Sequence, residues 1–186
     1  MSSRLNLLFP LYNILSLKGG IGKTSLAIKM AHSLGRKNRV LLIDNDGMSN
    51  LSLRLGYHIE SLVDGRYPLD SLVKIRRNTF LLRLRRNPFT QLNDINREKI
   101  LKDLIGRKYW KYIIVDNWTG ITEKDRIIRN IYENVDVNVG LFLTDQLSLD
   151  KTLEYLNNWS QLNAKYALLI NNDIDSNYQK DIYLKS

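Results

Sequence analysis

The sequence predicts an α/β fold built on a doubly wound, mainly parallel sheet with helices on both faces. Apolar runs rich in Ile, Val and Leu alternate with segments of helical spacing. Most of these runs are continuously apolar, as parallel strands covered on both faces are. A glycine-rich turn also links the first run to the first helical segment. In such folds ligands bind at the carboxyl ends of the strands.

The pattern predicts strands over residues 12–17, 39–44, 79–84, 112–116, 135–143 and 166–171. It predicts helices over residues 23–35, 93–106, 122–133 and 147–162, with Gly35 and Gly106 as C-terminal caps. Short helices are expected within 45–78. In TFLLRLRR (79–86) leucines alternate with arginines, which predicts a strand near the sheet edge with accessible arginines.

Length and composition indicate a single globular domain over residues 1–186, with residues 1–11 as an N-terminal extension. The absence of cysteine excludes disulfides, iron–sulfur clusters and thiolate metal sites. His32 and His58 are too few and too far apart for a zinc site. No apolar stretch approaches the ~20 residues that a transmembrane helix needs, and the start lacks a signal-peptide cleavage site. We therefore expect an intracellular protein.

The formal net charge of +9 is spread unevenly. Residues 70–111 contain 12 Lys or Arg residues and 4 Asp or Glu residues, a net charge of +8. Such a segment favours a polyanionic partner, either nucleic acid or an anionic membrane surface. A solvated basic face that aids solubility explains the composition equally well, so composition alone leaves both interpretations open.

Residues 19–24, GGIGKT, follow a predicted strand and open a predicted helix, which is the context that a phosphate-binding loop requires. Small residues let backbone N–H groups converge on phosphate oxygens, and the helix N-terminus adds a positive dipole. Lys23 can then reach the β- and γ-phosphates of a nucleotide, while the Thr24 hydroxyl can ligate Mg²⁺.

An additional lysine, Lys18, precedes the glycines, and the position where the standard G-x-x-x-x-G-K-[ST] pattern has its first glycine holds Leu17. Residues 18–24 instead fill the pattern K-G-G-x-G-K-[ST] at every position. This resembles the ParA/MinD family of deviant Walker A ATPases. The resemblance implies ATP and Mg²⁺ as ligands and a homodimer in the ATP state, in which Lys18 contacts the partner's nucleotide. The nucleotide-binding residues it implies here are Lys18, Gly19, Gly20, Ile21, Gly22, Lys23, Thr24 and Ser25.

The segment RVLLIDNDGMSNLSLRLG (39–56) resembles the second strand of that family and the loop that follows it. Asp46 matches the aspartate that orients the attacking water, so the resemblance assigns it to catalysis together with Lys18 and Lys23. Asp44 matches the aspartate that supports the Mg²⁺ shell, and Asn50 also keeps its place.

The segment YWKYIIVDNWTG (109–120) resembles the Walker B strand of the family, in which a terminal carboxylate, here Asp116, holds Mg²⁺ through water. Hard oxygen ligands suit Mg²⁺, and a strand-terminal carboxylate reaches the ligand edge of the sheet. LLINN resembles the last core strand, where Asn171 would contact adenine. The resemblance extends from residue 12 to about residue 172.

Two segments depart from the family pattern. Gly47 and Met48 stand where the family has Pro-Gln, and Asn117, Trp118 and Thr119 replace Thr-Pro-Pro. Gly47 is expected to loosen the segment that holds Asp46. Because both segments are nucleotide-sensing loops, the changes bear on the rate of hydrolysis rather than on ATP binding.

The favoured interpretation is a cytoplasmic, nucleoid-associated DNA partition ATPase. Its dimer would bind DNA without sequence preference, and a ParB-like DNA-bound activator protein would stimulate hydrolysis. On charge alone, the candidate DNA contacts are Arg76, Arg77, Arg83, Arg85 and Arg86. One alternative is a nucleotide-dependent dimeric interaction module with weak or no hydrolysis. The other is a MinD-type membrane-positioning ATPase, which ranks lower because residues 171–186 include few large apolar residues.

Overall fold

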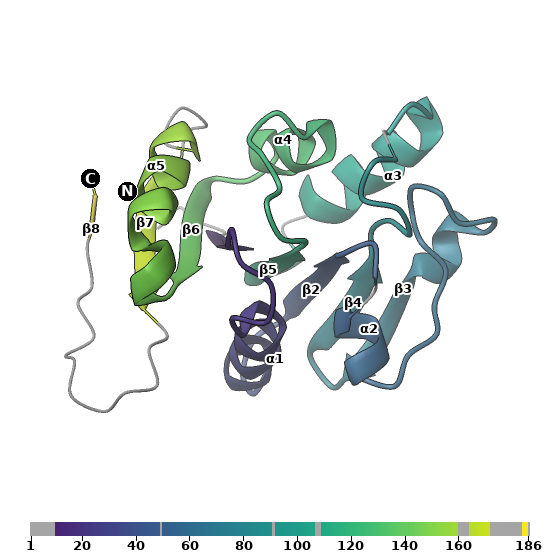
Figure 1. Ribbon diagram of the computed structural model, residues 1–186. Helices are drawn as coiled ribbons and strands as arrows, with labels where there is room; N and C mark the ends of the chain where they lie inside the picture. Colours follow the sequence, from purple (N-terminus) through teal and green to yellow (C-terminus); the bar gives the residue numbers. More distant parts are fainter. Residues whose placement is uncertain are drawn as a thin grey trace, which may run out of the picture.

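A computed structural model describes residues 10–48, 50–90, 92–106, 109–159, 164–171 and 184–185, the last two ranges by their backbone alone. Eight strands form one sheet in the order β3-β4-β2-β5-β1-β6-β7-β8 (Figure 1). The six strands from β4 to β7 run parallel, while β3 and β8 pair antiparallel at the two edges. The strands are β1 (Pro10–Leu15), β2 (Val40–Asn45), β3 (Leu72–Arg76), β4 (Thr79–Arg83), β5 (Tyr112–Asn117), β6 (Val137–Thr144), β7 (Ala164–Asn171) and β8 (Leu184–Lys185).

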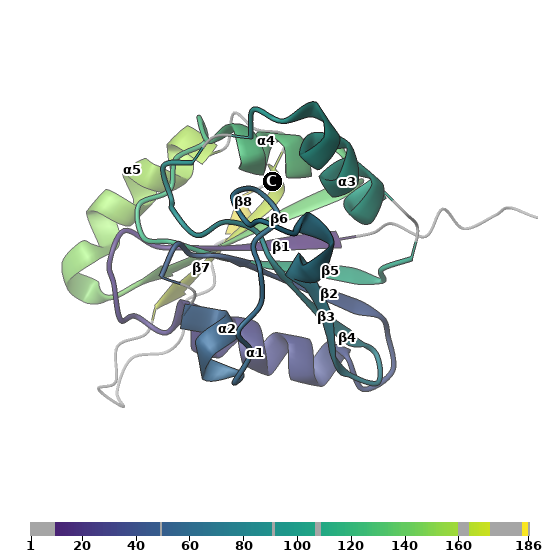
Figure 2. The same cartoon turned by 90° about the vertical axis from the view of Figure 1, so that its right-hand side faces the viewer.

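Helices cover both faces of the sheet, as Figure 2 shows, with α1 and α2 on one face and α3, α4 and α5 on the other. Successive strand residues point to opposite faces, and the buried residues accordingly divide into two apolar clusters, one on each face. The helices are α1 (Lys23–Leu34), α2 (Asn50–Arg54), α3 (Ile95–Gly106), α4 (Arg126–Glu133) and α5 (Leu149–Trp159), with 3₁₀ turns η1 (Pro68–Ser71) and η2 (Gln146–Ser148).

The predicted doubly wound α/β fold is confirmed, and each predicted strand is present within two residues of its expected bounds. The helix predicted over 122–133 begins only at Arg126, because the Asp125 side chain accepts hydrogen bonds from the N–H groups of Ile127 and Ile128. The helix predicted over 147–162 is divided into η2 and α5, and its last three residues lie outside the described ranges.

The two glycines that were predicted to cap helices, Gly35 and Gly106, differ in their position relative to the helix end. Gly35 is the C-cap of α1, but its backbone is right-handed. A Cβ there would lie 2.3 Å from the Thr79 hydroxyl oxygen and 2.6 Å from the Ala31 carbonyl oxygen, so close packing against β4 requires the glycine. Gly106 is the last residue of α3.

The edge of the sheet differs from the prediction. The stretch 45–78 holds α2 and η1 as expected, and it also holds β3, which pairs with β4 and covers it. Arg85 was predicted to be accessible, and this is wrong: its side chain is fully buried. It lies two residues after the end of β4 and turns into the interior beneath α4, where Asp125 pairs with it.

Within the described ranges, no helix is long and apolar enough to cross a membrane. The parallel strands all end at the same edge of the sheet, and the segments that follow β1, β2 and β5 surround a cavity there. This edge is the place where the sequence predicts the nucleotide.

Candidate nucleotide-binding site

The glycine-rich loop between β1 and α1 forms one wall of this cavity, whose volume is about 240 Å³. Gly20 and Gly22 have φ values of 73° and 100°, a region that side chains with a Cβ rarely adopt. Gly22 is the N-cap of α1 and provides no side-chain cap for the first turn. An uncapped helix N-terminus offers N–H groups to an anion. The described lining residues are Gly19, Gly20, Ile21, Gly22, Lys23, Thr24, Ser25, Asp46, Asn50, Arg54 and Thr119.

The Lys23 side chain is buried and held in this cavity by two hydroxyl groups. Its Nζ donates to Ser16 Oγ at 2.8 Å and to Thr119 Oγ1 at 2.9 Å. Burial lowers the pKa of Lys23, and the negative charges of Asp116 and Asp46 oppose that shift. An ammonium group held by neutral partners can turn to the oxygens of a bound phosphate, because none of its bonds is an ion pair.

Asp116 is the penultimate residue of β5 and lies beside this lysine. Its buried carboxyl oxygens accept no hydrogen bond of normal geometry from the described residues, although the Thr24 hydroxyl lies close enough to lower the pKa of Asp116. Burial, with a smaller contribution from the nearby Asp44, raises the pKa of Asp116 to about 7. The Thr24 hydroxyl and the Lys23 ammonium group offset the shift only in part. A buried carboxyl group without a partner is costly unless a cation joins it.

These residues fit a Mg²⁺ ion that arrives with the nucleotide. The Thr24 hydroxyl would bind it directly and Asp116 would hold its water ligands, which is how Mg²⁺ is commonly bound beside phosphates. Among the described residues, no group of three His, Cys, Asp or Glu side chains could hold a metal by itself. The site therefore suits a metal whose other ligands are water and phosphate oxygens.

Asp44 pairs with Asp116 across the β2–β5 ladder, but its carboxylate is already occupied. It accepts hydrogen bonds from the Ser52 N–H at 2.9 Å and the Ser52 hydroxyl at 2.5 Å. Burial raises the pKa of Asp44, and the bonds from Ser52 oppose the rise. These contacts attach α2 to the end of β2. A part for Asp44 in the Mg²⁺ shell stays a prediction.

Asp46 lines the cavity from the loop after β2. Its carboxylate accepts from the Met48 N–H at 3.1 Å and from Asn50 Nδ2 at 2.7 Å. The neighbouring Gly47 packs closely on the next loop, since a Cβ there would lie 2.3 Å from Pro88 Cδ. Gly47 therefore lets the loop after β2 pack against the loop that contains Pro88. This packing fixes the position of the segment that holds Asp46 and does not loosen it.

Lys18 lies outside the described lining of the cavity, with 53% of its side chain exposed. It forms an ion pair with Asp145, the N-cap of η2. The hydrogen bond from Lys18 and a second from Ser148 lower the pKa of Asp145 to about 2. The two lysines of the loop thus differ, because Lys23 faces the cavity and Lys18 faces solvent.

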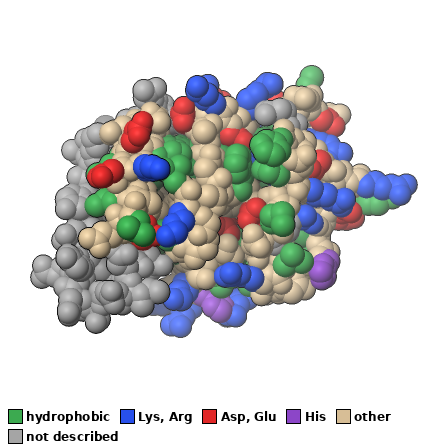
Figure 3. Space-filling model, in the orientation of Figure 1, with side chains coloured by type: hydrophobic (Ala, Val, Ile, Leu, Met, Phe, Trp, Pro, Cys, Tyr) green, Lys and Arg blue, Asp and Glu red, His purple; other side chains and the backbone are tan. Residues whose placement is uncertain are grey.

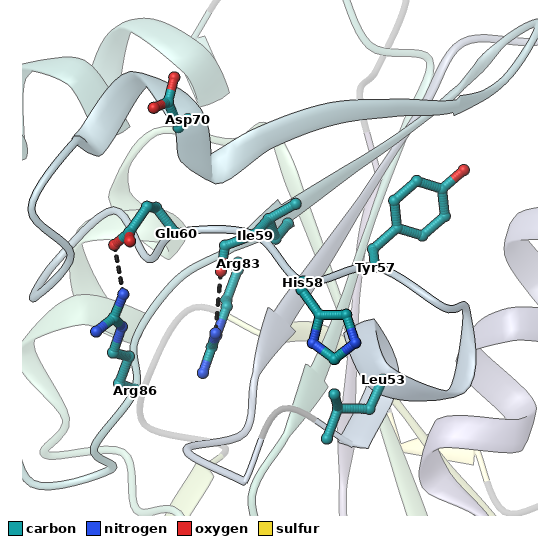
Figure 4. Close-up of a pocket in the computed structure, with 8 residues that line it drawn as sticks. All are labelled: Leu53, Tyr57, His58, Ile59, Glu60, Asp70, Arg83 and Arg86. Atoms are coloured by element: carbon teal, nitrogen blue, oxygen red, sulfur yellow. Dashed lines mark hydrogen bonds and ion pairs between the residues drawn. The ribbon is translucent and has the colours of Figure 1, made fainter.

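A second cavity, of about 440 Å³, is lined by Leu53 of α2, by residues that follow α2 and by residues at or near the end of β4 (Figure 4). Two of the candidate DNA-binding arginines line it. Arg83 donates to the Ile59 carbonyl oxygen at 3.0 Å, and Arg86 pairs with Glu60 at 2.5 Å. Arg86 remains partly exposed, as do Arg76 and Arg77 at the turn between β3 and β4. The side chain of Asn171 lies outside the described residues, so its predicted adenine contact stays a prediction.

Two lining residues were not predicted as site residues. Thr119 receives the Lys23 bond, and a hydroxyl group three residues after the Walker B aspartate was the available signal. Arg54 lines the cavity from α2 and donates to Ser25 Oγ at 3.1 Å. The sequence pattern does not indicate that the Arg54 side chain lines the cavity. Its orientation depends on the position of α2, which the hydrogen bonds from Ser52 to Asp44 hold at the end of β2.

Residues 12–183 match the pattern of the CobQ/CobB/MinD/ParA nucleotide-binding domain family. The chain belongs to this family. No curated protein sequence matches the chain. The family assignment confirms the predicted resemblance to the ParA/MinD family and the predicted α/β fold of the nucleoside-triphosphatase type. It also confirms a nucleotide as the class of ligand.

Solved structures of family members share the fold. A putative plasmid partition protein from Borrelia burgdorferi bound to AMPPNP is 20% identical, with a TM-score of 0.67 over 92% of this chain and 78% of that one. The MinD cell division protein from Aquifex aeolicus is 25% identical, with a TM-score of 0.64 over 87% and 68% of the two chains. A ParA family ATPase from Chlorobium tepidum is 20% identical, with a TM-score of 0.64 over 90% and 75%.

Proposed function

We propose that this chain is a ParA-like DNA partition ATPase, a single domain that dimerises around ATP and Mg²⁺. The dimer binds DNA without sequence preference, and a ParB-like DNA-bound protein stimulates hydrolysis. The observation that carries the proposal is that the two lysines of the loop lie in different environments. Lys23 faces the cavity, while Lys18 is exposed beside it. A lysine that lies outside its own cavity can serve a nucleotide held by a second copy. The proposed location is the cytoplasm, on the nucleoid.

Apolar side chains around the cavity support a dimer across this edge. The loops after β1, β2, β4 and β6 each expose one large apolar side chain. Met48 is 76% exposed, Phe89 is 77% exposed and Leu147 is 92% exposed, while Leu17 is partly exposed. Figure 3 shows apolar side chains spread over this face. Exposed apolar groups at the edge of the sheet that holds the cavity suit a surface that a protein partner covers.

In the proposed reaction, Lys23 binds the β- and γ-phosphates and the helix α1 N-terminus orients them. Thr24 and Asp116 would hold a Mg²⁺ ion, which would supply neutralisation of charge on the phosphate oxygens. Asp46 accepts a hydrogen bond from the attacking water and orients it toward the γ-phosphate. Asn50, which donates to Asp46, holds the carboxylate at the cavity wall.

Replacing Asp46 by alanine is expected to lower ATP turnover on the order of 100-fold, because the water loses its orienting group. Asp46→Asn, which keeps the size of the side chain, is expected to do the same. Steady-state phosphate release, measured with and without DNA, tests this. The matched control is Asp150→Asn, which removes an exposed carboxylate from α5. Turnover in Asp46→Ala equal to that of the unmodified chain would overturn the catalytic assignment and favour the interaction module without hydrolysis.

DNA binding is expected to depend on Arg76 and Arg77, the exposed arginines of the β3–β4 turn. Each phosphate contact that is lost lowers the salt dependence of binding by about one unit in the slope of log K against log salt. Arg76→Gln combined with Arg77→Gln should therefore weaken ATP-dependent DNA binding at low salt and flatten its salt slope. Lys151→Gln on α5 is the control. DNA binding in a gel shift that does not depend on ATP would contradict the DNA part of the proposal, and so would a lack of binding at low salt.

The MinD-type alternative depends on an amphipathic C-terminal segment, and residues 172–183 lie outside the described ranges. Sedimentation with anionic liposomes distinguishes this alternative. ATP-dependent sedimentation would favour it, and none is expected.

A further inference from the structure

Six buried or half-buried polar side chains form a continuous hydrogen-bonded chain beneath α4, and the backbone of α4 joins its two ends; we call this arrangement the α4 ring. Its members in order are Asp125, Arg85, Asn45, Asn117, Asn13 and Tyr132. Asp125 is the N-cap of α4 and Tyr132 lies within that helix. The helix itself therefore closes the ring over about two turns.

Arg85 is the only positively charged member and makes the most contacts. Its Nε donates to Asn45 Oδ1 at 2.7 Å, and its two terminal nitrogens donate to the two Asp125 oxygens at 2.9 Å each. One terminal nitrogen also donates to the Pro88 carbonyl oxygen at 2.9 Å. A planar guanidinium group can make this forked contact, while a lysine cannot.

The three asparagines continue the ring across the sheet. Asn45 donates to Asn117 at 2.7 Å, and Asn117 donates to Asn13 at 2.5 Å and to the Ile14 carbonyl oxygen at 3.1 Å. Asn13 in turn donates to the Tyr132 hydroxyl group. Burial raises the pKa of Tyr132 well above its usual value, so that group stays neutral.

The ring lies directly behind the candidate nucleotide site. Asp44 pairs with Asp116 across the β2–β5 ladder, and the next residues, Asn45 and Asn117, pair in the same way. Because neighbouring strand residues point to opposite faces, the carboxylates face α1 and the amides face α4. The carboxyl-end halves of the adjacent strands β2, β5 and β1 carry Asn45, Asn117 and Asn13, and Arg85 lies two residues after the end of the next strand, β4. The ring thus joins the carboxyl ends of four adjacent strands.

Each segment around the cavity begins at or near a ring member. The loop with Asp46 starts at Asn45, and the loop with Thr119 is bounded by Asn117 at one end and Asp125 at the other. Arg85 binds the Pro88 carbonyl oxygen, and Pro88 is the residue against which Gly47 packs. The glycine-rich loop follows β1, which carries Asn13.

We propose that Arg85 is a positioning residue for ATP hydrolysis. It completes the ring, and the ring sets the loops of Asp46 and Thr119 relative to each other and to the glycine-rich loop. This inference rests on the proposed ATPase function. A buried polar network of this kind specifies one arrangement only when all its members are satisfied. The removal of Arg85 takes the donor from Asn45 Oδ1, from the Pro88 carbonyl oxygen and from Asp125 Oδ2, while Asp125 Oδ1 keeps the Ile127 and Ile128 N–H groups.

The test compares Arg85→Met with the double variant Arg85→Met/Asp125→Asn. The single variant leaves a carboxylate unpaired, whereas the double variant removes both charges and keeps an asparagine to cap α4. The melting temperature should therefore fall in the single variant and recover in part in the double variant. We expect kcat to fall on the order of 100-fold in both, since small displacements of catalytic groups cost this much. The affinity for a fluorescent ATP analogue should stay within about threefold of the unmodified chain.

A purely structural role would make turnover follow the melting temperature, so recovery of kcat in the double variant would overturn the proposal. Retention of full turnover in Arg85→Lys, which keeps the charge but not the fork, would overturn it as well. Lys102→Gln, which breaks the exposed ion pair with Glu98 on α3, is the matched control and should change neither quantity.

Amide hydrogen exchange separates this inference from the proposed function. Without any nucleotide, residues 46–48 and 118–122 should exchange at least about tenfold faster in the double variant, while α5 is unchanged. If the unmodified chain shows no ATP turnover but exchange accelerates as expected, the ATPase proposal fails and the positioning role of the ring stands. Unchanged exchange in both loops would overturn that role whatever the turnover.

Discussion

Lys18→Ala is expected to abolish ATP-dependent dimers while leaving ATP binding by the single chain largely intact. Lys18 lies outside the described lining of its own cavity, so its removal takes no contact from the nucleotide in the same chain. Lys23, Thr24 and the loop N–H groups remain. Light scattering of the chain with and without a non-hydrolysable ATP analogue gives the dimer fraction, and titration with a fluorescent analogue gives the affinity.

Two controls separate the proposed role of Lys18 from its contact within the chain. Asp145→Asn removes the ion pair that Lys18 makes and keeps a residue able to cap η2, so its dimers should persist. Lys29→Ala removes an exposed lysine from α1 and should change nothing. If Asp145→Asn also abolished dimers, the ion pair rather than a contact across the dimer would be the cause. Nucleotide-dependent dimers in Lys18→Ala would contradict the proposed dimer interface.

The glycine-rich loop could be predicted from the sequence because its chemistry lies in seven consecutive residues. Lys18 to Thr24 include the glycines that let the backbone approach a phosphate, the start of the helix and the lysine that binds the phosphate. The fold could be predicted because six apolar strands have similar composition. β3 was missed because it is short and only partly buried, and the stretch 45–78 was expected to hold short helices. Val73 to Arg76 does alternate apolar and basic residues, which is the pattern of a half-buried strand. With β3 unseen, β4 was placed too near the edge.

Arg85 shows what sequence patterns leave undetermined. In the run TFLLRLRR it is indistinguishable from Arg83 and Arg86, yet it alone turns beneath α4. Its partners lie 40 positions away in both directions along the chain, at Asn45 and Asp125. In the sequence, Asn45 and Asn117 are simply the neighbours of Asp44 and Asp116, with no pattern that links them. They meet only because the register of β2 and β5 pairs them. Such contacts depend on tertiary structure, which no local pattern records.

Asp116→Asn is expected to stabilise the nucleotide-free chain, and the effect should grow as the pH rises. The buried Asp116 carboxyl group has a pKa of about 7, against 3.8 for an unperturbed aspartate. Between these values the folded chain keeps a proton that the unfolded chain has released, so stability falls as the pH rises through this window. Asparagine carries no charge and removes this dependence. The stability gap between variant and unmodified chain should therefore widen on the order of 3 kcal/mol from pH 5 to pH 8.

Urea unfolding at both pH values measures this gap, and Asp136→Asn, an exposed carboxylate, controls for a general change in charge. Asp44, Asp46 and Lys23 surround the same site and are present in both chains, so the two chains differ only at the Asp116 side chain. ATP with Mg²⁺ should reverse the order, because ligand binding stabilises only a chain that can bind it tightly. The unmodified chain should gain melting temperature while Asp116→Asn gains little. A gap that is constant from pH 5 to pH 8 would mean that Asp116 is satisfied without a cation, and the inferred Mg²⁺ site would lose its main support.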